Sequence, residues 1–437
     1  MGSVIRMKTT IVSPKIYTYG SLVLGGILRE RGHSVRITRD LDPSGEVTLL
    51  SLFSTSQLID PEIREFARRC PKIYVGGPVG LVPEIVLGEL EVDGVVMGEG
   101  EEVVADLVEE GASAEIPGVA FLEEGEVVKT DPVPVGDLDH VMPLIPDDLK
   151  DQNVRGANVY IETHRGCLGG CTFCQVPRFF GRSIRSRSLP NILAEVREMK
   201  RMGISRVAVS GGTGSLFGYG KEVNKVAFIE LLRSLAEILG PKNLSVPDMR
   251  VDFVDEEILE AVRRYTVGWV FFGIESGSEK ILKAMRKGTS PDKNLEAVEL
   301  AHRCGVKVGG SFIVGYPGET EEDYQATLDF MEEAMLEDVF ASVAEPIPGT
   351  PLARLALDLP REEDLLRRNH SGDYRALKIS EAEARCFNLM LHGLSCRPIP
   401  RIVDEGIYSA LLEETRTQGI EVRRVMDLLE KYRDLIV

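Results

Sequence analysis

Three cysteines in one short run have the clearest chemical potential in this 437-residue sequence. Cys167, Cys171 and Cys174 follow the spacing Cys-x3-Cys-x2-Cys. Thiolates are typical ligands of iron–sulfur clusters, and a [4Fe–4S] cluster has four irons, so three thiolates leave one iron open to a further ligand. No cysteine follows nearby to close the fourth position, as an electron-transfer ferredoxin would require. A structural zinc site usually needs four ligands in two pairs. Zinc binding and simple burial stay as alternatives.

The charge balance argues against a nucleic-acid partner. With 51 basic and 69 acidic residues the formal net charge is −18, which repels phosphate backbones. A local basic patch could still form just after the cysteine run, at Arg178, Arg182, Arg185 and Arg187. We expect these arginines to meet carboxylates of a cofactor or of the protein itself, with RNA binding as the alternative.

The sequence has no apolar run of 18 or more residues and no signal-peptide pattern at its start. We therefore expect a cytoplasmic protein without a membrane segment. Seven cysteines, three of them clustered, favour a reducing compartment over disulfide bonds. The remaining four are expected to be small buried side chains: Cys70, Cys304, Cys386 and Cys396.

The first segment, residues 7–130, alternates short apolar strands with helices, which predicts an α/β fold with a parallel sheet. The expected strands are Thr9–Ser13, Ser34–Thr38, Val47–Phe53, Lys72–Gly76 and Gly94–Met97, and the expected helices are Ser21–Arg31, Pro61–Arg69, Pro83–Leu90 and Glu101–Glu110. Ligands of such sheets bind beyond the carboxyl ends of the strands. Small residues gather there, where a backbone could approach a flat ligand closely. No Gly-x-Gly-x-x-Gly fingerprint opens the first helix, which weakens a dinucleotide interpretation.

A proline-rich linker, residues 131–156, precedes a second α/β segment at residues 157–351. Its expected strands are Asn158–Thr163, Arg206–Ser210, Gly268–Gly273 and Lys307–Val314. Small and polar residues follow each strand, and the first strand leads directly into the cysteine run. Residues 352–437 form the remainder, which we expect to be a charged helical cap with Val425, Leu428, Leu429 and Tyr432 on its apolar face. We expect this cap to cover the mouth of the second segment, with a purely structural role as the alternative.

The cysteine run and the motifs at the strand ends resemble those of the radical S-adenosylmethionine (SAM) enzymes. The resemblance implies a partial (β/α)6 barrel in which Cys167, Cys171 and Cys174 bind a [4Fe–4S] cluster and SAM chelates the open iron. Carried over onto the matching positions, it implies SAM contacts from Phe173, Gly211, Gly212, Thr213, Glu275, Ser276, Val314 and Gly315. The glycine run after the second strand lacks the acidic residue that usually follows it in this superfamily.

The first segment resembles the cobalamin-binding domain that is fused to many radical SAM enzymes. The run Gly98-Glu99-Gly100-Glu101 is frequent in that fusion, and a Rossmann-like fold is implied. The implied cobalamin contacts are Tyr19, Gly20, Ser54, Thr55, Ser56, Gly76, Gly77, Pro78, Gly98, Glu99 and Gly100. The cobalt-ligating motif Asp-x-His-x-x-Gly is absent, so cobalamin would bind without a histidine beneath cobalt. We expect His33 to be a helix-end residue.

The resemblance implies a methyltransferase that forms a 5′-deoxyadenosyl radical, abstracts hydrogen from an unactivated sp3 carbon and adds a methyl group from methylcobalamin. Such chemistry requires no catalytic residues beyond the cofactors, and we expect His164 to be a packed or hydrogen-bonded side chain. A dry pocket between the two α/β segments follows from this logic.

Within that family the chain most resembles the archaeal glutamine C-methyltransferases of methyl-coenzyme M reductase. That likeness implies a protein or peptide substrate, the α-carbon of a glutamine, and an unidentified one-electron reductant as partner. Three alternatives stay open. They are a cobalamin-associated rearrangement or cyclisation, a tRNA or protein methylthiotransferase, and a non-catalytic corrinoid- or cluster-binding protein. The methylthiotransferase would need three further cluster cysteines, whereas only Cys70 precedes the motif.

Overall fold

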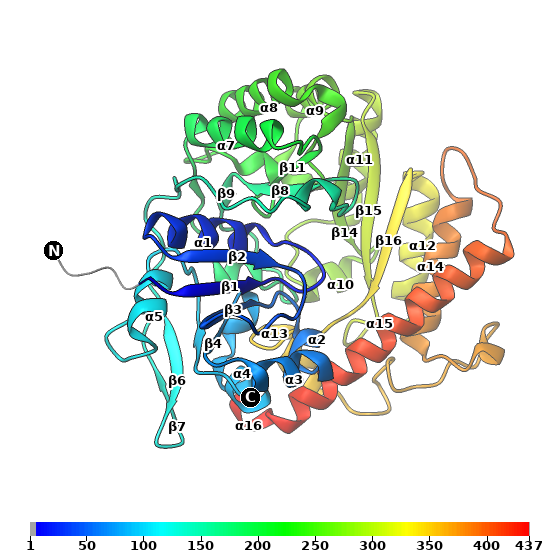
Figure 1. The fold of residues 1–437 in the computed structure, drawn as a ribbon. Coiled ribbons are helices and arrows are strands. Elements are labelled where there is room, and N and C mark those ends of the chain that lie inside the picture. Colours follow the sequence, from blue (N-terminus) through cyan, green and yellow to red (C-terminus); the bar gives the residue numbers. More distant parts are fainter. Residues whose placement is uncertain (1–5, 437) are drawn as a thin grey trace.

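The computed structural model describes residues 6–436 and confirms the α/β class. Figure 1 shows an N-terminal sheet, a second curved set of strands above it, and C-terminal helices along one side. Buried apolar side chains form one continuous core through both sheets. No described helix is both long enough and apolar enough to cross a membrane.

The first sheet has seven strands in the order β2-β1-β3-β4-β5-β6-β7. The strands are β1 Lys8–Val12, β2 Ser34–Thr38, β3 Val47–Ser51, β4 Ile73–Gly76, β5 Gly94–Val96, β6 Val119–Glu123 and β7 Glu126–Lys129. The first five pair in parallel, as predicted, whereas β6 and β7 form an antiparallel hairpin at the edge that the sequence interpretation missed. A parallel centre places the carboxyl ends of β1, β3, β4 and β5 along one side of the sheet.

Short helices connect these strands: α1 Tyr19–Glu30, α2 Thr55–Leu58, α3 Pro61–Arg69, α4 Pro83–Glu89 and α5 Val104–Glu110. The third begins where expected, because the Asp60 side chain accepts from the backbone N–H of Glu62 and a proline occupies the first turn. The last begins at Val104 rather than Glu101. The residues from Gly98 to Glu101 form a loop at the end of β5 instead, and the N–H of Val104 donates to the carbonyl of Gly100 over 2.9 Å.

The second set of strands forms the expected partial barrel from two parallel sheets, β12-β11-β8 and β13-β14-β15-β16. The strands are β8 Val159–Glu162, β11 Val207–Ser210, β12 Leu244–Ser245, β13 Asp248–Met249, β14 Trp269–Glu275, β15 Lys307–Val314 and β16 Asp338–Val343. Pro247, which has no N–H to donate to a strand neighbour, lies between β12 and β13, where the chain passes from one sheet to the other. Helices on the outside connect them: α7 Leu189–Arg201, α8 Lys225–Leu239, α9 Glu256–Tyr265, α10 Glu279–Ala284, α11 Pro291–Arg303 and α12 Glu321–Ala334.

The C-terminal part contains α13 Pro351–Asp358, α14 Glu381–Ser395, α15 Glu405–Lys431 and α16 Arg433–Ile436. The expectation that residues 352–437 form a helical cap is wrong for residues 361–380. Apart from one 3-10 turn at Arg375–Leu377, these residues are irregular, and regular helix resumes only where Ser380 and Glu383 form a capping box. The long α15 crosses from β16 toward α2 of the first sheet (Figure 1), and its predicted apolar positions Val425, Leu428 and Leu429 are buried.

Candidate active site

The cysteine run follows β8 through a short strand, β9 His164–Arg165, which pairs with β10 Arg185–Ser186. Gly166 enters the loop with φ +96, and a Cβ atom there would lie 2.2 Å from the carbonyl oxygen of Ser183. Only glycine fits this close backbone approach. The loop then turns so that the sulfurs of Cys167 and Cys171 lie 3.4 and 3.7 Å from the position of a Cβ atom on Gly169.

The three thiols are grouped, but not as tightly as the ligands of a single metal ion. Cys171 is buried and Cys167 and Cys174 are half-buried. Among the described residues, their sulfurs are not a set that lies within 4.8 Å of one another. A tetrahedral zinc ion with bonds of about 2.3 Å would bring its sulfur ligands to roughly 3.8 Å. The wider spacing suits a cluster in which each thiolate binds a different iron.

The structure also places positive charge beside these thiols, which sequence reasoning missed. Arg250, directly after β13, is buried with its Nη1 3.6 Å from the sulfur of Cys171, and its Nη2 donates to the carbonyl of Lys287 over 2.7 Å. The buried ammonium group of Lys287 lies nearby and forms an ion pair with Glu275. Burial, and then the neighbouring thiols, raise the pKa of Cys174 to about 11. A cationic side chain at a barrel strand end was a signal that could have been read from the sequence.

The glycine run Gly211–Gly214, after β11, lies against the cysteine loop. A Cβ atom on Gly212 would be 3.9 Å from Cβ of Cys167. The hydroxyls of Thr213 and Ser215 are fully buried and lack a hydrogen-bond partner among the described residues. Buried hydroxyls are normally paired, so this loop retains capacity to bind a polar ligand next to the cysteines.

The other proposed SAM residues lie around the same region, though several are already engaged by the protein. The Glu275 carboxylate accepts from Lys287 Nζ over 2.6 Å, and the buried Ser276 hydroxyl lies 3.2 Å from that of Thr327. Val314 is buried at the end of β15. The N–H of Gly315 donates to Glu319 Oε2 over 2.9 Å.

Phe173 packs against the small apolar cluster that contains Tyr316. The hydroxyls of Tyr316 and Thr172 lie 2.7 Å apart, which ties the cysteine loop to the end of β15. The cysteine loop, the glycine run and the end of β15 are therefore held together, and Glu275 stands beside them with its charge neutralised by a lysine. The SAM contacts themselves remain a prediction.

A cavity of about 280 Å³ opens beyond the carboxyl ends of the first sheet. Its walls come from both α/β segments. The first contributes the residues after β1, β3, β4 and β5, and the second contributes Glu162, Arg165, Phe179 and Phe180. The two phenylalanines belong to or directly follow α6 Val176–Phe179, the helix after the cysteine loop. The cavity is thus adjacent to that loop.

The floor of this cavity suits a flat ligand. A Cβ atom on Gly20 would meet nothing within 4 Å, and one on Gly76 would meet only Val96 at 3.9 Å. Side chains at these positions would fill the space above the sheet, so glycine keeps it open. No histidine lines the cavity, and His33 is buried elsewhere with its Nε2 3.0 Å from Glu109. A ligand in this space would therefore be held by the glycine-rich strand ends and not by a histidine of the described residues.

The structure brings some of the predicted cobalamin residues to the cavity and leaves others outside it. Those in its walls are Gly20, Gly76, Gly77, Pro78, Gly98, Glu99 and Gly100. Tyr19 is instead directed into a buried polar cluster, where its hydroxyl is 2.8 Å from Glu195 Oε2. Ser54, Thr55 and Ser56 are not among the lining residues either, because Ser54 caps α2 by accepting from the N–H of Ser56.

A buried ion-pair network joins the two segments at the edge of the cavity. Arg165 binds Glu99 over 2.9 Å, Glu162 over 2.7 Å, and also Glu101. Arg185 approaches Glu99 from the other side. Although burial opposes it, hydrogen bonding to Arg185 and the charges of both arginines lower the pKa of Glu99. Burial raises the pKa of Glu162 to about 7, against the charge of Arg165.

The four arginines after the cysteine loop are all used inside the protein. Arg185 and Arg187 pair with Glu99 and Glu195 respectively. Arg178 Nη1 donates to the carbonyl of Cys171 over 3.1 Å, and Arg182 donates to that of Leu168 over 2.8 Å. The expectation that these arginines meet carboxylates is confirmed for Arg185 and Arg187, whereas Arg178 and the exposed Arg182 donate to backbone carbonyls instead.

The chain is similar in sequence to proteins of a known superfamily. Residues 161–331 match the Radical SAM superfamily. A Methanocaldococcus jannaschii protein, MJ0865, which carries a provisional methylthiotransferase name, is 51% identical over 99% of this chain and 98% of its own length.

Two solved structures are similar over nearly the whole chain, at 17% identity. The radical SAM methyltransferase TsrM from Kitasatospora setae, with cobalamin and a [4Fe–4S] cluster bound, covers 97% of this chain and 99% of its own with a TM-score of 0.68. The cobalamin-dependent radical SAM enzyme OxsB covers 98% of this chain and 76% of its own with a TM-score of 0.65. These two structures share the fold of this chain, and the family match over residues 161–331, the relative MJ0865 and the cysteine loop together show that the chain is an enzyme of the radical SAM superfamily.

Proposed function

We propose that this enzyme is a cobalamin-dependent C-methyltransferase that uses a [4Fe–4S] cluster, SAM and cobalamin to methylate an unactivated sp3 carbon. The observation that carries the proposal is the shared wall between the cavity and the cysteine loop. Phe179 and Phe180 follow Cys174 within six residues and line the cavity over the first sheet. A substrate carbon between the two sites could face a radical source on one side and a methyl donor on the other.

The cofactors supply the bond cleavages, a 5′-deoxyadenosyl radical from SAM and a methyl group from cobalamin, and the protein supplies geometry and a dry environment. In this proposal Cys167, Cys171 and Cys174 hold the cluster and the glycine run holds SAM. Gly20 and Gly76 leave room for the corrin, and the two phenylalanines exclude water from the gap. The Arg165 network fixes the two halves of the site relative to each other.

The proposal divides the chain by role. Residues 7–130 bind cobalamin, residues 157–351 bind the cluster and SAM, and residues 131–156 connect the two. Residues 352–437 cap the substrate side, where α15 contacts both β16 and α2. Each turnover consumes two SAM molecules and two electrons. It releases methionine, 5′-deoxyadenosine, which carries the abstracted hydrogen atom, and S-adenosylhomocysteine together with the methylated product.

For the substrate we propose the α-carbon of a glutamine in methyl-coenzyme M reductase, with a one-electron reductant as the second partner. The support is the resemblance of the whole chain to that branch of the superfamily. The cavity carboxylates Glu99, Glu101 and Glu162 are all bound to Arg165, and this ion pairing gives them a positioning role in the proposal.

A methylthiotransferase is the second candidate, because MJ0865 carries that provisional name. Methylthiolation adds a sulfur atom, for which the methylthiotransferases use a second cluster held by three further cysteines. In this chain Cys70 is the one cysteine before the motif, and it lies at the end of α3, where its sulfur is 3.4 Å from the carbonyl oxygen of Phe66. The chain therefore offers no second set of thiolates in its N-terminal third.

The experiment is anaerobic turnover of the reconstituted enzyme with SAM, reductant and a glutamine-bearing peptide of the reductase, followed by mass spectrometry. SAM with a deuterated methyl group gives a product carrying one labelled methyl and no added sulfur, with 5′-deoxyadenosine and S-adenosylhomocysteine in equal amounts. A sulfur-containing product would establish the methylthiotransferase, and an isomerised or cyclised product without label would establish a rearrangement. Methylation of a small metabolite, with no activity on the peptide, would refute the proposed substrate but not the proposed methyl transfer.

A further inference from the structure

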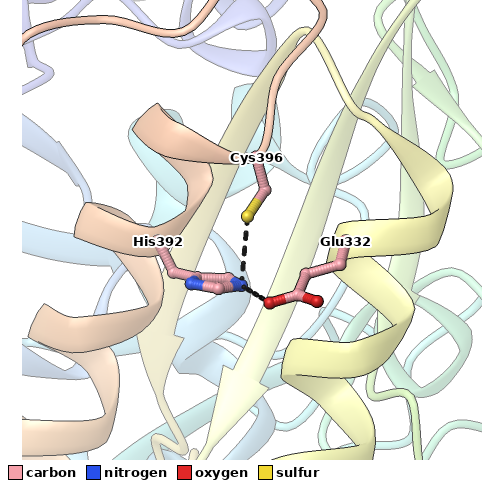
Figure 2. Close-up of side chains that lie close together, drawn as sticks. All are labelled: Glu332, His392 and Cys396. Carbon is pink, nitrogen blue, oxygen red and sulfur yellow. Dashed lines mark hydrogen bonds and ion pairs between the residues drawn. The ribbon is translucent and has the colours of Figure 1, made fainter.

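A second group of metal-ligating side chains lies outside the radical site, on the far side of β16. Glu332 projects from α12 toward His392, near the end of α14, and Cys396, which caps that helix (Figure 2). His392 Nε2 is 3.2 Å from the sulfur of Cys396 and 3.3 Å from Glu332 Oε1. All three potential ligand atoms lie within 4.8 Å of one another.

Two ordinary hydrogen bonds do not account for this arrangement. Both partners approach the same ring nitrogen, as the two dashed lines in Figure 2 show. A neutral imidazole has at Nε2 either one N–H or one lone pair, so the thiol and the carboxylate would have to share a single N–H in a weak three-centre hydrogen bond. A nucleophilic thiol–imidazole–carboxylate relay would instead use the two opposite ring nitrogens. Three donor atoms that converge on one point are the arrangement that a cation requires.

The donor types point to zinc. A thiolate, an imidazole and a carboxylate are the ligands of Zn²⁺, whereas Mg²⁺ and Ca²⁺ require oxygen donors. In a zinc tetrahedron with bonds of about 2.0–2.3 Å, neighbouring ligand atoms lie roughly 3.4–3.6 Å apart. The distances from His392 Nε2 are close to those edges. Solvent can reach the group, because the Glu332 side chain is 62% exposed.

We propose that Glu332, His392 and Cys396 form a zinc site with a fourth position open to water. The metal would join α12 of the barrel to the end of α14 in the C-terminal cap. It would also fix the start of the loop that follows Cys396, in which Ile399 and Ile402 are 80% and 91% exposed. This site is independent of the radical chemistry, since none of its ligands belongs to the cysteine loop or to the cavity.

The test is zinc binding by the full-length enzyme after its iron–sulfur cluster has been reconstituted. We expect one zinc per chain to survive dialysis, and X-ray absorption at the zinc edge to show one sulfur neighbour among lighter ligands. C396S and H392N should each weaken zinc binding at least about tenfold. E332Q, at an exposed position where folding is not at risk, should weaken it in the same direction.

Matched controls separate this site from general thiol or surface binding. C304S removes another half-buried cysteine at a helix end, and E333Q removes the exposed neighbour of Glu332. Both should retain zinc at the wild-type affinity. Zinc binding that is absent, that survives C396S and E332Q, or that shows three sulfur neighbours would overturn the proposal, the last because zinc would then occupy the radical-site cysteines.

Discussion

The imidazole of His164 occupies the space that a side chain on Gly211 would need. A Cβ atom at Gly211 would lie 2.3 Å from Cε1 of the ring. The ring is held from both sides. Its Nε2 donates to the carbonyl of Thr213 over 3.0 Å, which leaves Nδ1 to accept from the hydroxyl of Thr163. The strand that leads into the cysteine loop is thereby fixed against the glycine run expected to bind SAM.

Alanine at Gly211 should therefore damage SAM cleavage more than cluster assembly. The added methyl group would clash with His164, so the glycine run must move away from the cysteine loop. We expect G211A to reduce 5′-deoxyadenosine formation at least about tenfold, as a displacement of 1 Å at a reacting centre can do. Iron and sulfide content should stay close to wild type.

G220A is the matched control for this change, because a Cβ atom at Gly220 meets nothing within 4 Å. Equal rates for G211A and wild type, measured by chromatography of the products under excess SAM and reductant, would show that the glycine run does not position SAM.

Burial lowers the pKa of His164 to about 4, which makes stability depend on pH. In the unfolded chain the ring takes up a proton below its ordinary pKa of about 6.5, whereas the folded protein does not. The unfolded state therefore binds more protons between pH 6.5 and pH 4, and stability falls as the pH is lowered through that range. From this group alone we expect a loss of about 2 kcal/mol between pH 7 and pH 5.

Melting temperatures across this pH range should fall less steeply for H164N than for wild type, even though the variant is less stable at pH 7. Parallel curves for the two proteins would contradict the assignment of a buried neutral imidazole.

The ion-pair network between the two segments predicts that replacing Glu99 lowers both the stability of the protein and its retention of cobalamin. E99Q removes the carboxylate that neutralises Arg185 and part of Arg165, and a buried charge without its partner costs about 3 kcal/mol. We expect a lower melting temperature, together with weaker retention of cobalamin because Arg165 and Glu99 both line the cavity. E102Q changes the neighbouring exposed residue and should leave both measurements unchanged. Cobalamin binding at wild-type affinity in E99Q would show that the ion-pair network does not contribute to cobalamin binding.

The positive charge of Arg250 should raise the reduction potential of the iron–sulfur cluster. Its guanidinium is buried 3.6 Å from the sulfur of Cys171 and is paired with Asp252 over 2.7 Å on its other side. A positive charge there favours the reduced, more negative cluster, and Asp252 offsets part of this effect. R250Q should lower the reduction potential by at most roughly 100 mV, the size of a unit charge at about 6 Å in a medium of effective dielectric constant near 20. R250K keeps the charge and should shift the potential far less. A redox titration followed by electron paramagnetic resonance measures both, and equal potentials in R250Q and wild type would contradict the assignment.

The sequence predicted the elements well where short local signals decide them. Strand and helix alternation located the five parallel strands of the first sheet and most of the barrel. The Cys-x3-Cys-x2-Cys spacing located the cysteine loop. The edge hairpin of β6 and β7 was missed although β6 begins with three buried apolar residues, Val119, Ala120 and Phe121, because β7 is exposed and gives no matching apolar pattern. The short β12 and β13 were missed because each has only two residues.

The parts of the site that depend on distant contacts were less accessible from the sequence. The position of Arg250 beside Cys171 spans 79 residues, and the pairing of Arg165 with Glu99 spans 66. Tyr19 carried the same strand-end signal as Gly20, yet its side chain turns toward Glu195 in the second segment. Cys396 was expected to be an inert buried cysteine, and only the fold of α14 onto α12 shows the histidine and glutamate beside it.

Cobalamin binding tests the central claim most directly. Purified enzyme with a reconstituted cluster is titrated anaerobically with hydroxocobalamin, and bound corrinoid is quantified from its absorption after gel filtration. The account predicts about one cobalamin per chain. G76L should lose it, because the new side chain enters the open space above the sheet, whereas G136L should keep it, because Gly136 has nothing within 4 Å of its Cβ position and does not line the cavity. No bound cobalamin, with normal formation of 5′-deoxyadenosine, would contradict a cobalamin-dependent methyl transfer.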